Sequence, residues 1–402
     1  MAKVMEGIRV LEVASWTFVP AAGAILADWG ADVIKVEHPN HPDPQRAHLH
    51  AGMEGARSHI MEQTNRGKRS VAIDIATPDG LAVLYDLVRT SDVFLTNFLP
   101  AGRQKLRIDV EHIRSVNPAI VYVRGSGMGV RGPDANRAGY DGTAYVARSS
   151  FASGLTPRGN EWPIQGTAAV GDLPGAMTIA GGISAGLFQR ERTGHAPVVD
   201  ISLLAVGMWT MSPDIVSTKM YGLHDVPRPT RYQTPNPISI TYKTKDGRFA
   251  KLSMFESDKF WGDLVTHLGV PELAGDPRFD SHAKRAANSD ACVHALDEAF
   301  GRYTLAELKV RFETLRGAWG PVQTAVELHD DPAAIANGYL SVVKPDDGPE
   351  FTLVATPVQF DEQATEQLQP APDHGQHTDS VLEQLGYDWD RIIELKVAGA
   401  IL

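Results

Sequence analysis

Short β-rich runs alternate with amphipathic segments in the first part of this chain, and that alternation is the strongest constraint on its fold. The run IRVLEVA at residues 8–14 precedes PAAGAILADWG at 20–30, and DVIKVE follows at 32–37. Four apolar side chains of the middle segment fall on one helical face: Ala22, Ile25, Leu26 and Trp29. Pro20 stands at the start of this segment and Gly30 at its end, which is typical of a helix. The pattern predicts two parallel strands joined by a helix.

The same alternation continues over the next part of the chain. Further strand-like runs are SVAIDI at 70–75, DVFLTNF at 92–98, AIVYVRGSG at 119–127 and PVVDISL at 197–203. Helix-like segments lie between them, among them DGLAVLYDLVRT at 79–90. We therefore predict an α/β fold with a mostly parallel sheet and helices on its faces.

A change of composition marks a second region. DVPRPTRYQTPNP at 225–237 is rich in proline and polar residues, which is typical of a linker. ISITYKTKDGRFAKLSM at 238–254 then predicts a hairpin that turns at its Asp-Gly pair, and helical segments follow it. We predict a large domain that includes residues 1–224 and a smaller α+β domain over residues 225–329.

Composition argues against some classes of partner. The chain has 38 Lys and Arg residues and 49 Asp and Glu residues, and its net charge of −11 argues against general binding to nucleic acids or anionic membranes. No stretch approaches the length of a membrane span and no signal-peptide pattern is visible, so we expect a cytoplasmic protein. The single cysteine, Cys292, lies in an apolar helical stripe and is predicted to be a buried structural thiol.

Two motifs invite ligand assignments. GMGVRG at 127–132 matches a dinucleotide-binding pattern, but the residues after it contain too many helix breakers, and we interpret it as a loop over a cleft. An early loop holds five histidines: His38, His41, His48, His50 and His59. Their spacing lacks the regularity of zinc motifs, so we interpret them as solvated loop residues and assign no metal.

Basic residues gather in two runs that border predicted strands: Arg66, Lys68 and Arg69 in NRGKRS, and Arg103, Lys105 and Arg107 in GRQKLR. Such a run is often only a solvated face. At strand ends of an α/β fold, on an otherwise acidic chain, the two runs also fit a phosphate-bearing ligand. The residues alone leave both interpretations open.

GDLPGAMTIAGGISAGLFQRERTG at 171–194 predicts a helix with glycines in its interior, although each costs about 1 kcal/mol relative to alanine. Asp172 is placed as an N-cap with Pro174 in the first turn, so capping is one interpretation. The glycines indicate that a backbone or a ligand packs very close to the helix. Backbone N–H groups at a helix N-terminus also stabilise negative charge on an attacked carbonyl, so catalysis by Asp172 is the other interpretation.

Several segments together resemble the class III CoA-transferases, the family of carnitine-CoA transferase and formyl-CoA transferase. They are GIRVLEVASWTFVPAAGAILADWGADVIKVEHP, NRGKRSVAIDI, DVFLTNFLP, the segment 171–194 and PAPDHGQHTDSVLEQLGY, in the family's order over nearly the whole chain. The resemblance implies a Rossmann-like large domain to which residues 330–402 return. It also implies an obligate homodimer of interlocked chains, with an acyl-CoA and a carboxylic acid as ligands.

The resemblance implies roles for residues near the thioester. The aspartate of the family's Gly-Asp motif is the nucleophile, and it falls on Asp172. This carboxylate would attack a donor acyl-CoA and pass through a mixed anhydride to an aspartyl-CoA thioester. Trp16, Thr17 and Phe18 match the loop after the first strand, close to the reacting thioester.

Coenzyme A itself is expected at a second group of residues. Asn97 and Phe98 match the motif that lines the CoA site in the family. Lys105 falls where the family often has a basic residue near the phosphates, and His38 falls where an arginine is common. Arg69, from the first basic run, completes the predicted CoA-binding residues.

One branch of the family, the α-methylacyl-CoA racemases, uses a histidine in a G-H-D motif as one of two bases. This chain has GYD instead, so the histidine position is Tyr140. A phenol with a reference pKa near 10 is a poor substitute for an imidazole, which favours CoA transfer over racemisation. A racemase or epimerase and a non-catalytic acyl-CoA binding protein are the alternatives. The donor and acceptor acids cannot be named from the sequence.

Overall fold

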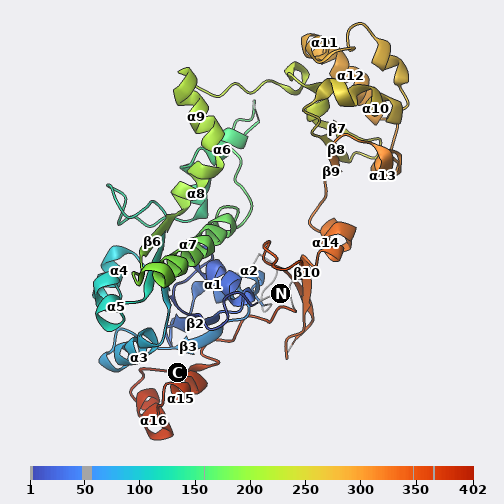
Figure 1. Ribbon diagram of the computed structural model, residues 1–402. Helices are drawn as coiled ribbons and strands as arrows, with labels where there is room; N and C mark the ends of the chain where they lie inside the picture. Colours follow the sequence, from blue (N-terminus) through green and yellow to red (C-terminus); the bar gives the residue numbers. More distant parts are fainter. Residues whose placement is uncertain (1–2, 48–56, 158, 347, 365–366) are drawn as a thin grey trace. The chain divides into compact units, whose positions relative to one another are not determined.

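The computed structural model describes the chain in five stretches, residues 3–47, 57–157, 159–346, 348–364 and 367–402. The chain divides into two compact units, one of Met1–Gly222 with Pro332–Leu402 and the other of Leu223–Asp331 (Figure 1). Each unit encloses its own cluster of buried apolar side chains. The first unit contains the features that position the site described below.

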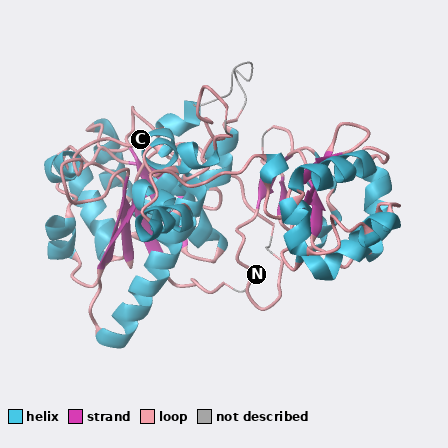
Figure 2. Ribbon diagram, turned by 90° about the horizontal axis from the view of Figure 1, so that it is seen from above, coloured by secondary structure: helices cyan, strands magenta, loops and turns pink. Residues whose placement is uncertain are grey.

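A six-stranded parallel sheet forms the centre of the first unit (Figure 2). Its strands are β1 (Arg9–Val13), β2 (Asp32–Glu37), β3 (Arg69–Ala72), β4 (Val93–Thr96), β5 (Val121–Ser126) and β6 (Val198–Ser202). They lie in the order β3-β2-β1-β4-β5-β6, and each neighbouring pair is parallel. Because the strand order reverses between β1 and β4, the carboxyl ends of these two strands diverge and leave a crevice.

Apolar side chains cover both faces of the sheet, as is usual for parallel strands. In β1, Val10 belongs to one buried cluster, while Leu11 and Val13 belong to the other. The first cluster includes residues of α1 (Phe18–Asp28), α7 (Asp172–Thr193) and α8 (Leu203–Thr210). The second includes residues of α3 (Pro78–Arg89), α5 (Val110–Val116), α15 (Thr378–Gln384) and α16 (Trp389–Val397).

The C-terminal segment packs along the β3 edge of the same sheet. The backbone N–H of Ala72 donates to the hydroxyl of Thr378 over 3.0 Å. Ile73, just after β3, forms a β-bridge with Ile401. These contacts between distant parts of the sequence join the last helices to the sheet.

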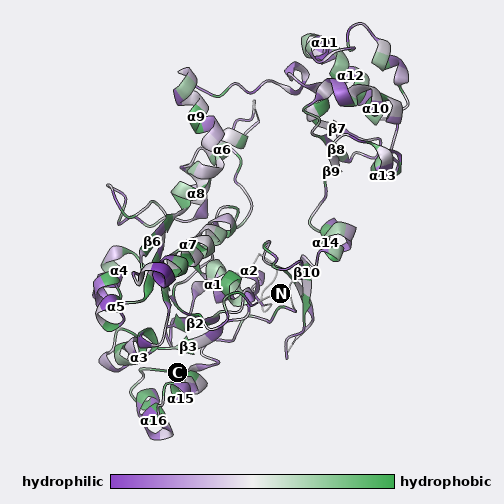
Figure 3. Cartoon of the chain, in the orientation of Figure 1, coloured by the Kyte–Doolittle hydropathy of each residue, from purple (hydrophilic) through white to green (hydrophobic). Residues whose placement is uncertain are grey.

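Shorter elements complete the first unit. They are the 3-10 helix η1 (Pro44–Ala47), α2 (His59–Asn65), α4 (Pro100–Lys105), the π-helix η2 (Asp141–Ala147), α6 (Phe151–Leu155), α9 (Ser212–Tyr221), α14 (Pro332–Ala336) and the hairpin β10 (Leu340–Val343) with β11 (Phe351–Val354). The hydropathy colours of Figure 3 show that α7 becomes strongly polar towards its C-terminal end, where Arg190 and Arg192 occupy the last turn.

The second unit combines a small antiparallel sheet with helices. Its strands are β7 (Thr241–Lys243), β8 (Phe249–Leu252) and β9 (Trp319–Pro321), and its main helices are α10 (Ser257–His267), α11 (His282–Ala287), α12 (Ser289–Phe300) and α13 (Leu305–Arg311). Gly247, in the turn between β7 and β8, has a left-handed φ of 77°. Cys292 is buried, as the sequence predicts, and burial raises the pKa of its thiol to about 12.

The predicted glycine-containing helix is confirmed as α7, and two of its glycines have a clear steric cause, whereas nothing lies within 4 Å of a Cβ added at Gly181. A Cβ on Gly175 would lie 2.4 Å from the ring of Phe18 in α1. On Gly186 it would lie 3.0 Å from Val121 of the sheet. The close neighbours of this helix are therefore α1 and the sheet, and both belong to the same unit.

Candidate active site

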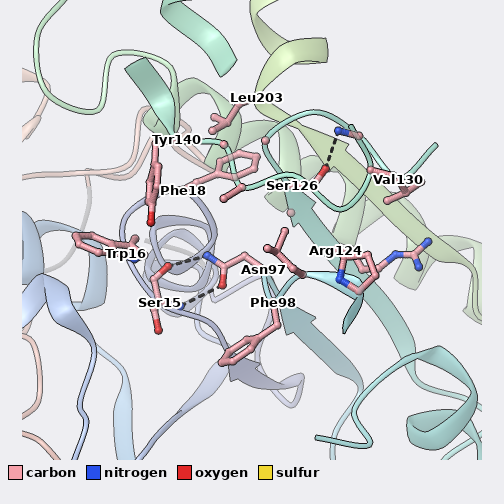
Figure 4. Close-up of a pocket in the computed structure, with 18 of the residues that line it drawn as sticks. Ser15, Trp16, Phe18, Asn97, Phe98, Arg124, Ser126, Val130, Tyr140 and Leu203 are labelled. Atoms are coloured by element: carbon pink, nitrogen blue, oxygen red, sulfur yellow. Dashed lines mark hydrogen bonds between the residues drawn. The ribbon is translucent and has the colours of Figure 1, made fainter. Parts of the chain in front are cut away.

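A cavity of about 280 Å³ opens at the carboxyl edge of the parallel sheet (Figure 4). It is lined by the segments that follow β1, β4, β5 and β6, by Gly139 and Tyr140 before η2, and by Asp172 at the start of α7. Every lining residue belongs to the first unit. The cavity thus occupies the crevice at the reversal of strand order, where open α/β sheets bind their ligands.

The loop after β1 forms one wall of the cavity and is tied to the end of β4 by Asn97. The Asn97 side-chain Nδ2 donates to the Ser15 carbonyl over 2.7 Å, and the Ser15 N–H donates to Asn97 Oδ1 over 3.2 Å (Figure 4). Both polar ends of the Asn97 side chain therefore bond to one backbone residue. In this structure Asn97 shapes the wall of the cavity.

Trp16 in the same loop has a left-handed φ of 69°, a conformation that few non-glycine residues adopt. Its backbone N–H donates to Asp43 Oδ1 over 3.0 Å. Its ring meets Tyr140 edge to face, with centroids 5.8 Å apart and planes at 84° (Figure 4). The next residue, Thr17, donates its hydroxyl to Gln45 Oε1 over 3.0 Å. Trp16 and Thr17 therefore line the cavity from a loop with an unusual backbone conformation, and Tyr140 contacts Trp16 from the segment before η2.

Two lysines and two carboxylates form a buried ionic cluster beneath this loop: Glu12, Lys35, Asp43 and Lys68. Lys35 Nζ lies 2.9 Å from Asp43 and 3.2 Å from Glu12, with all three side chains fully buried. Lys68 Nζ lies 2.8 Å from Glu12. Burial alone lowers the pKa of Lys35, but the carboxylates of Asp43 and Glu12 outweigh it and raise that pKa. The charges of the cluster are therefore mutually neutralised.

The buried ionic cluster also bonds to the backbone on both sides of the loop. Lys35 Nζ donates to the Ala14 carbonyl over 2.9 Å, and Lys68 Nζ donates to the Pro20 carbonyl over 2.8 Å. Asp43 accepts the Trp16 N–H between these two points. The cluster fixes the loop before, at and after the residues that line the cavity.

Asp172 occupies the first residue of α7, and its environment differs from that of the cluster. The N-cap is Gly171 and no side chain caps the helix, so the interpretation of Asp172 as an N-cap is wrong. The reason is geometric, because the Gly171 N–H donates to Asp141 Oδ1 over 3.0 Å and a Cβ at Gly171 would lie 2.1 Å from Tyr145. Burial, together with the negative charge of Asp141, raises the pKa of Asp172 to about 7.

Such a carboxylate suits covalent chemistry. At neutral pH a group with a pKa of about 7 is substantially ionised, while its partial burial leaves it poorly solvated. The N-terminus of a long helix adds backbone N–H groups that favour negative charge nearby. Asp172 can therefore act as a nucleophile towards a carbonyl carbon in the cavity, or as a base.

The structure brings seven of the ten predicted site residues together around the cavity: Trp16, Thr17, Phe18, Asn97, Phe98, Tyr140 and Asp172. The three predicted basic residues do not line it. Arg69 pairs with Asp32 at 2.6 Å, and His38 lies 3.6 Å from Asp74. Lys105 is exposed at the end of α4. Their contact with CoA phosphates stays a prediction.

Two arginines that line the cavity were not selected from the sequence as site residues. Arg103 belongs to the second basic run, and Arg124 lies in β5. Arg124 is paired with Asp200 of β6 through contacts of 2.6 and 2.9 Å. Asp141, whose charge acts on Asp172, was also not selected from the sequence. Its position next to Tyr140 in the GYD motif was the signal that could have identified it. The available signal for Arg103 was its basic run, whereas Arg124, inside the predicted strand at 119–127, gave none.

The remaining sequence interpretations concern loops and absences. Gly127 and Gly129 of the GMGVRG segment line the cavity, and turns rather than a helix follow them. His48 and His50 lie outside the described residues. Within the five stretches that the structure describes, no group of three or more His, Cys, Asp or Glu residues could hold a metal. Nor does any described helix combine the length and apolar character needed to cross a bilayer.

Comparison with known proteins covers almost the entire chain. Residues 5–378 match the family described as CoA-transferase family III. The chain is 30% identical to (R)-2-hydroxy-4-methylpentanoate CoA-transferase of Clostridioides difficile, over 98% of each protein. It is 32% identical to succinate–glutarate CoA-transferase of Agrobacterium fabrum, over 95% of each protein. Its structure is similar to that of a CaiB/BaiF family protein from Brucella suis, with a TM-score of 0.82 and 28% identity over 95% of this chain and 99% of the other.

Proposed function

The chain belongs to CoA-transferase family III and is an enzyme that transfers CoA between acids, and on this premise we propose that Asp172 is its nucleophile. The observation that carries the proposal is the position of Asp172. It lies in the cavity at the carboxyl edge of the sheet, with a pKa raised to about 7 by burial and by Asp141. A carboxylate with these properties is suited to attack a thioester without an external base.

The proposed reaction begins when a carboxylate oxygen of Asp172 attacks the carbonyl carbon of the donor acyl-CoA. The carbon–sulfur bond breaks, which leaves a mixed anhydride and CoA thiolate. The thiolate then attacks the Asp172 carbonyl of the anhydride, so that an aspartyl-CoA thioester forms and the donor acid leaves as a carboxylate. This division replaces one difficult exchange by easier steps and consumes no ATP.

The second half of the reaction repeats these steps in the opposite direction. A carboxylate of the acceptor acid attacks the aspartyl thioester and expels CoA thiolate, which gives an anhydride of Asp172 with the acceptor. The thiolate attacks the acceptor carbonyl of that anhydride. The products are the new acyl-CoA and the free Asp172 carboxylate, which is ready for another cycle.

The cavity walls support each step in a specific way. Trp16, Thr17 and Phe18 are proposed to surround the reacting acyl group, together with Tyr140, whose ring packs edge to face on Trp16. Asn97 and Phe98 are proposed to guide the CoA arm, Asn97 by holding the loop against which that arm lies. Enclosure in the cavity protects the anhydride and thioester from water.

The alternative activity is removal of a proton α to the thioester, as in the racemase branch of the family. It would require a second base close to Asp172. Tyr140 packs on Trp16, and Asp141 accepts the Gly171 N–H. Neither side chain therefore takes the place of the histidine that serves as the second base in the racemases. We therefore place CoA transfer first. Incubation of an α-methylacyl-CoA in deuterated water should give little exchange at the α carbon, and rapid exchange without an acceptor acid would reverse this order.

An interlocked homodimer is the assembly that the resemblance implies, and we propose it for this chain. Large apolar side chains are exposed along α7, α8 and α9, including Leu173, Phe188, Trp209 and Met220. Exposed large apolar side chains of this kind are typical of an interface between subunits. Light scattering during size-exclusion chromatography measures the assembly directly, and a stable monomer at micromolar concentration would contradict the proposal.

The experiment that tests the nucleophile is trapping of the acylated enzyme. Wild-type protein incubated with an acyl-CoA and then with hydroxylamine should carry a hydroxamate on the peptide that contains Asp172. Asp172→Asn protein serves as the control and should carry none. A hydroxamate on another carboxylate, or transferase activity in folded Asp172→Asn protein, would contradict the assignment. Paired screens of carboxylic acids with succinyl-CoA and acetyl-CoA, analysed by mass spectrometry, identify the donor and the acceptor.

A further inference from the structure

Arg103 is a buried arginine in the wall of the cavity, and its guanidinium has no ion-pair partner among the described residues. Arg103 is 8% exposed, and it lines the cavity from α4. In the described part of the chain, no carboxylate oxygen lies within 4.0 Å of its side-chain nitrogens, so it has no salt bridge. Its one protein acceptor there is the Phe98 carbonyl, which takes a hydrogen bond from Nη1 over 2.5 Å. Nε has no hydrogen-bond partner among the described residues.

The nearby charged groups are already committed to other partners. Asp200 forms two hydrogen bonds with Arg124, of 2.6 and 2.9 Å. Asp109 accepts the backbone N–H of His112 over 3.2 Å and lies 2.7 Å from its ring nitrogen. Both carboxylates act on Arg103 only through charge interactions, which raise its pKa less than burial lowers it.

A buried positive charge without a partner is unfavourable in a folded protein. Burial lowers the pKa of Arg103, which records the same cost in the absence of an anion. Arginine nevertheless remains charged under ordinary conditions, and its planar donors suit phosphate and carboxylate oxygens. The position is therefore one at which an incoming anion would replace solvent as the missing partner.

We propose that Arg103 binds an oxyanion of the acyl-CoA substrate, a phosphate or a carboxylate, inside the cavity. The proposal rests on the proposed function, because it takes acyl-CoA as the ligand of this cavity. A CoA phosphate and a distal carboxylate of a dicarboxylic acyl group present the same oxygen chemistry to a guanidinium. In either case Arg103, rather than the exposed Lys105 of the same helix, supplies the buried positive charge.

A structural role limited to the Phe98 carbonyl is the competing explanation, and substitution can separate the two. Arg103→Gln keeps an N–H donor for that carbonyl but removes the charge, whereas Arg103→Lys keeps the charge. Arg89→Gln removes a charge from the exposed last turn of α3, outside the cavity lining, and is the matched control. Circular dichroism and thermal unfolding first establish that each variant is folded.

Binding is measured without turnover, by calorimetric titration of each full-length protein with CoA and with pantetheine, which has no phosphates. If a phosphate is the partner, Arg103→Gln should weaken CoA binding at least tenfold, Arg103→Lys should weaken it less, and pantetheine binding should not change. Arg89→Gln should alter CoA affinity less than threefold. High salt should reduce the effect of Arg103→Gln on CoA affinity only slightly, because a buried charge is screened less than an exposed one.

The second arm compares succinyl-CoA with butyryl-CoA, which lacks the terminal carboxylate. If the acyl carboxylate is the partner, Arg103→Gln should raise KM at least tenfold for succinyl-CoA alone and leave CoA affinity unchanged. Equal affinities and equal KM values in wild type and Arg103→Gln, for every one of these ligands, would overturn the proposal. That result would leave the nucleophile untouched, because hydroxylamine trapping at Asp172 does not depend on Arg103.

Discussion

Asp172 and Asp43 are two carboxylates at the same edge of one parallel sheet, and their surroundings are opposite. Asp43 lies in a fully buried cluster where Lys35 is 2.9 Å away and the Trp16 N–H is bound. Asp172 has the negative charge of Asp141 near it instead, and its pKa is raised to about 7 by burial and by that charge. Pairing makes a carboxylate a structural support, because its charge is already satisfied. The lack of a partner leaves a carboxylate able to react.

The contrast extends to stability. Breaking a buried ion pair on one side is strongly destabilising, because it leaves an uncompensated charge. Removing an unpaired carboxylate relieves a cost that the folded protein otherwise bears. Proteins often retain such unfavourable groups where activity requires them. The same substitution, a carboxylate to its amide, should therefore have opposite effects on folding at these two positions.

The largest effect is expected at Asp172. Asp172→Asn should lower transferase activity by a factor on the order of 10⁴ or more, because an amide is a very weak nucleophile. Loss of a covalent nucleophile commonly has effects of this size. Coupled assay of CoA transfer between acids measures it. Comparable activity in the folded variant would remove the proposed distinction between the two carboxylates.

Asp172→Asn should at the same time stabilise the protein at pH 8. A pKa raised from 3.8 to about 7 means that the folded state holds the proton more tightly than the unfolded state. The free energy of unfolding of the wild type therefore falls as pH rises from about 4 to 7, and the variant lacks this fall. At pH 8 the gain should be about 1–3 kcal/mol after allowance for partial exposure. Denaturant unfolding at pH 5 and pH 8 tests the sign, and a less stable variant at pH 8 would contradict it.

The buried ionic cluster should give the second largest effect. Lys35→Met leaves Glu12 and Asp43 without their shared cation, and the loss should be about 3–5 kcal/mol in the free energy of unfolding. Lys259→Met removes one member of an exposed pair with Glu256 and is the control, with an expected loss below about 1 kcal/mol. Denaturant titration measures both. Equal losses would mean that burial does not distinguish the two pairs.

The sequence pointed to Asp172 as a site residue, but it gave no sign of the buried ionic cluster that contains Asp43 and Lys35. Asp172 was found because its glycine-rich helix and the surrounding motifs match a family. Lys35 stands in DVIKVE, where the pattern correctly predicts β2, but a lysine in a strand gives no sign of complete burial. Its partners lie 23 residues before it and 8 residues after it. Such a cluster exists only once the strand order is known.

The fold itself was predictable to a similar extent. Alternating runs predicted the parallel strands, and β2 has the bounds expected from the sequence. The order of the strands could not come from periodicity, because side-chain alternation carries no information about which strands are neighbours. Arg103 illustrates the same limit, since its basic run was recognised while its burial depends on how α4 lies against the cavity. The resemblance pointed to Asp172 as the proposed nucleophile, and the geometry pointed to Arg103.

Substitution of Gly175 tests whether the cavity around Asp172 depends on the close packing of α7 against α1. Gly175→Ala would place a Cβ 2.4 Å from the Phe18 ring, so α1 and α7 must separate slightly. The expected loss is about 1–3 kcal/mol in the free energy of unfolding, with lower activity because Phe18 lines the cavity. Gly262→Ala in α10 is the control, because nothing lies within 4 Å of its added methyl. It should gain about 0.5–1 kcal/mol. A stabilised Gly175→Ala protein would show that the helices can separate without loss.

The smallest effect should come from Asp141, the carboxylate beside the proposed nucleophile, and it is a shift in pH dependence. Asp141→Asn keeps an oxygen that accepts the Gly171 N–H but removes the negative charge that helps to raise the pKa of Asp172. Because the ionised carboxylate is the attacking form, the rate of hydroxamate trapping in the wild type should rise with pH and level off above about 7. In Asp141→Asn the pKa of Asp172 should fall, since less repulsion opposes its ionisation, and the midpoint should move by up to about one pH unit towards acid. Asp86→Asn, which removes a charge from α3 outside the cavity lining, should leave the midpoint unchanged. A midpoint that stays fixed or moves to higher pH in Asp141→Asn would show that burial alone sets the reactivity of Asp172.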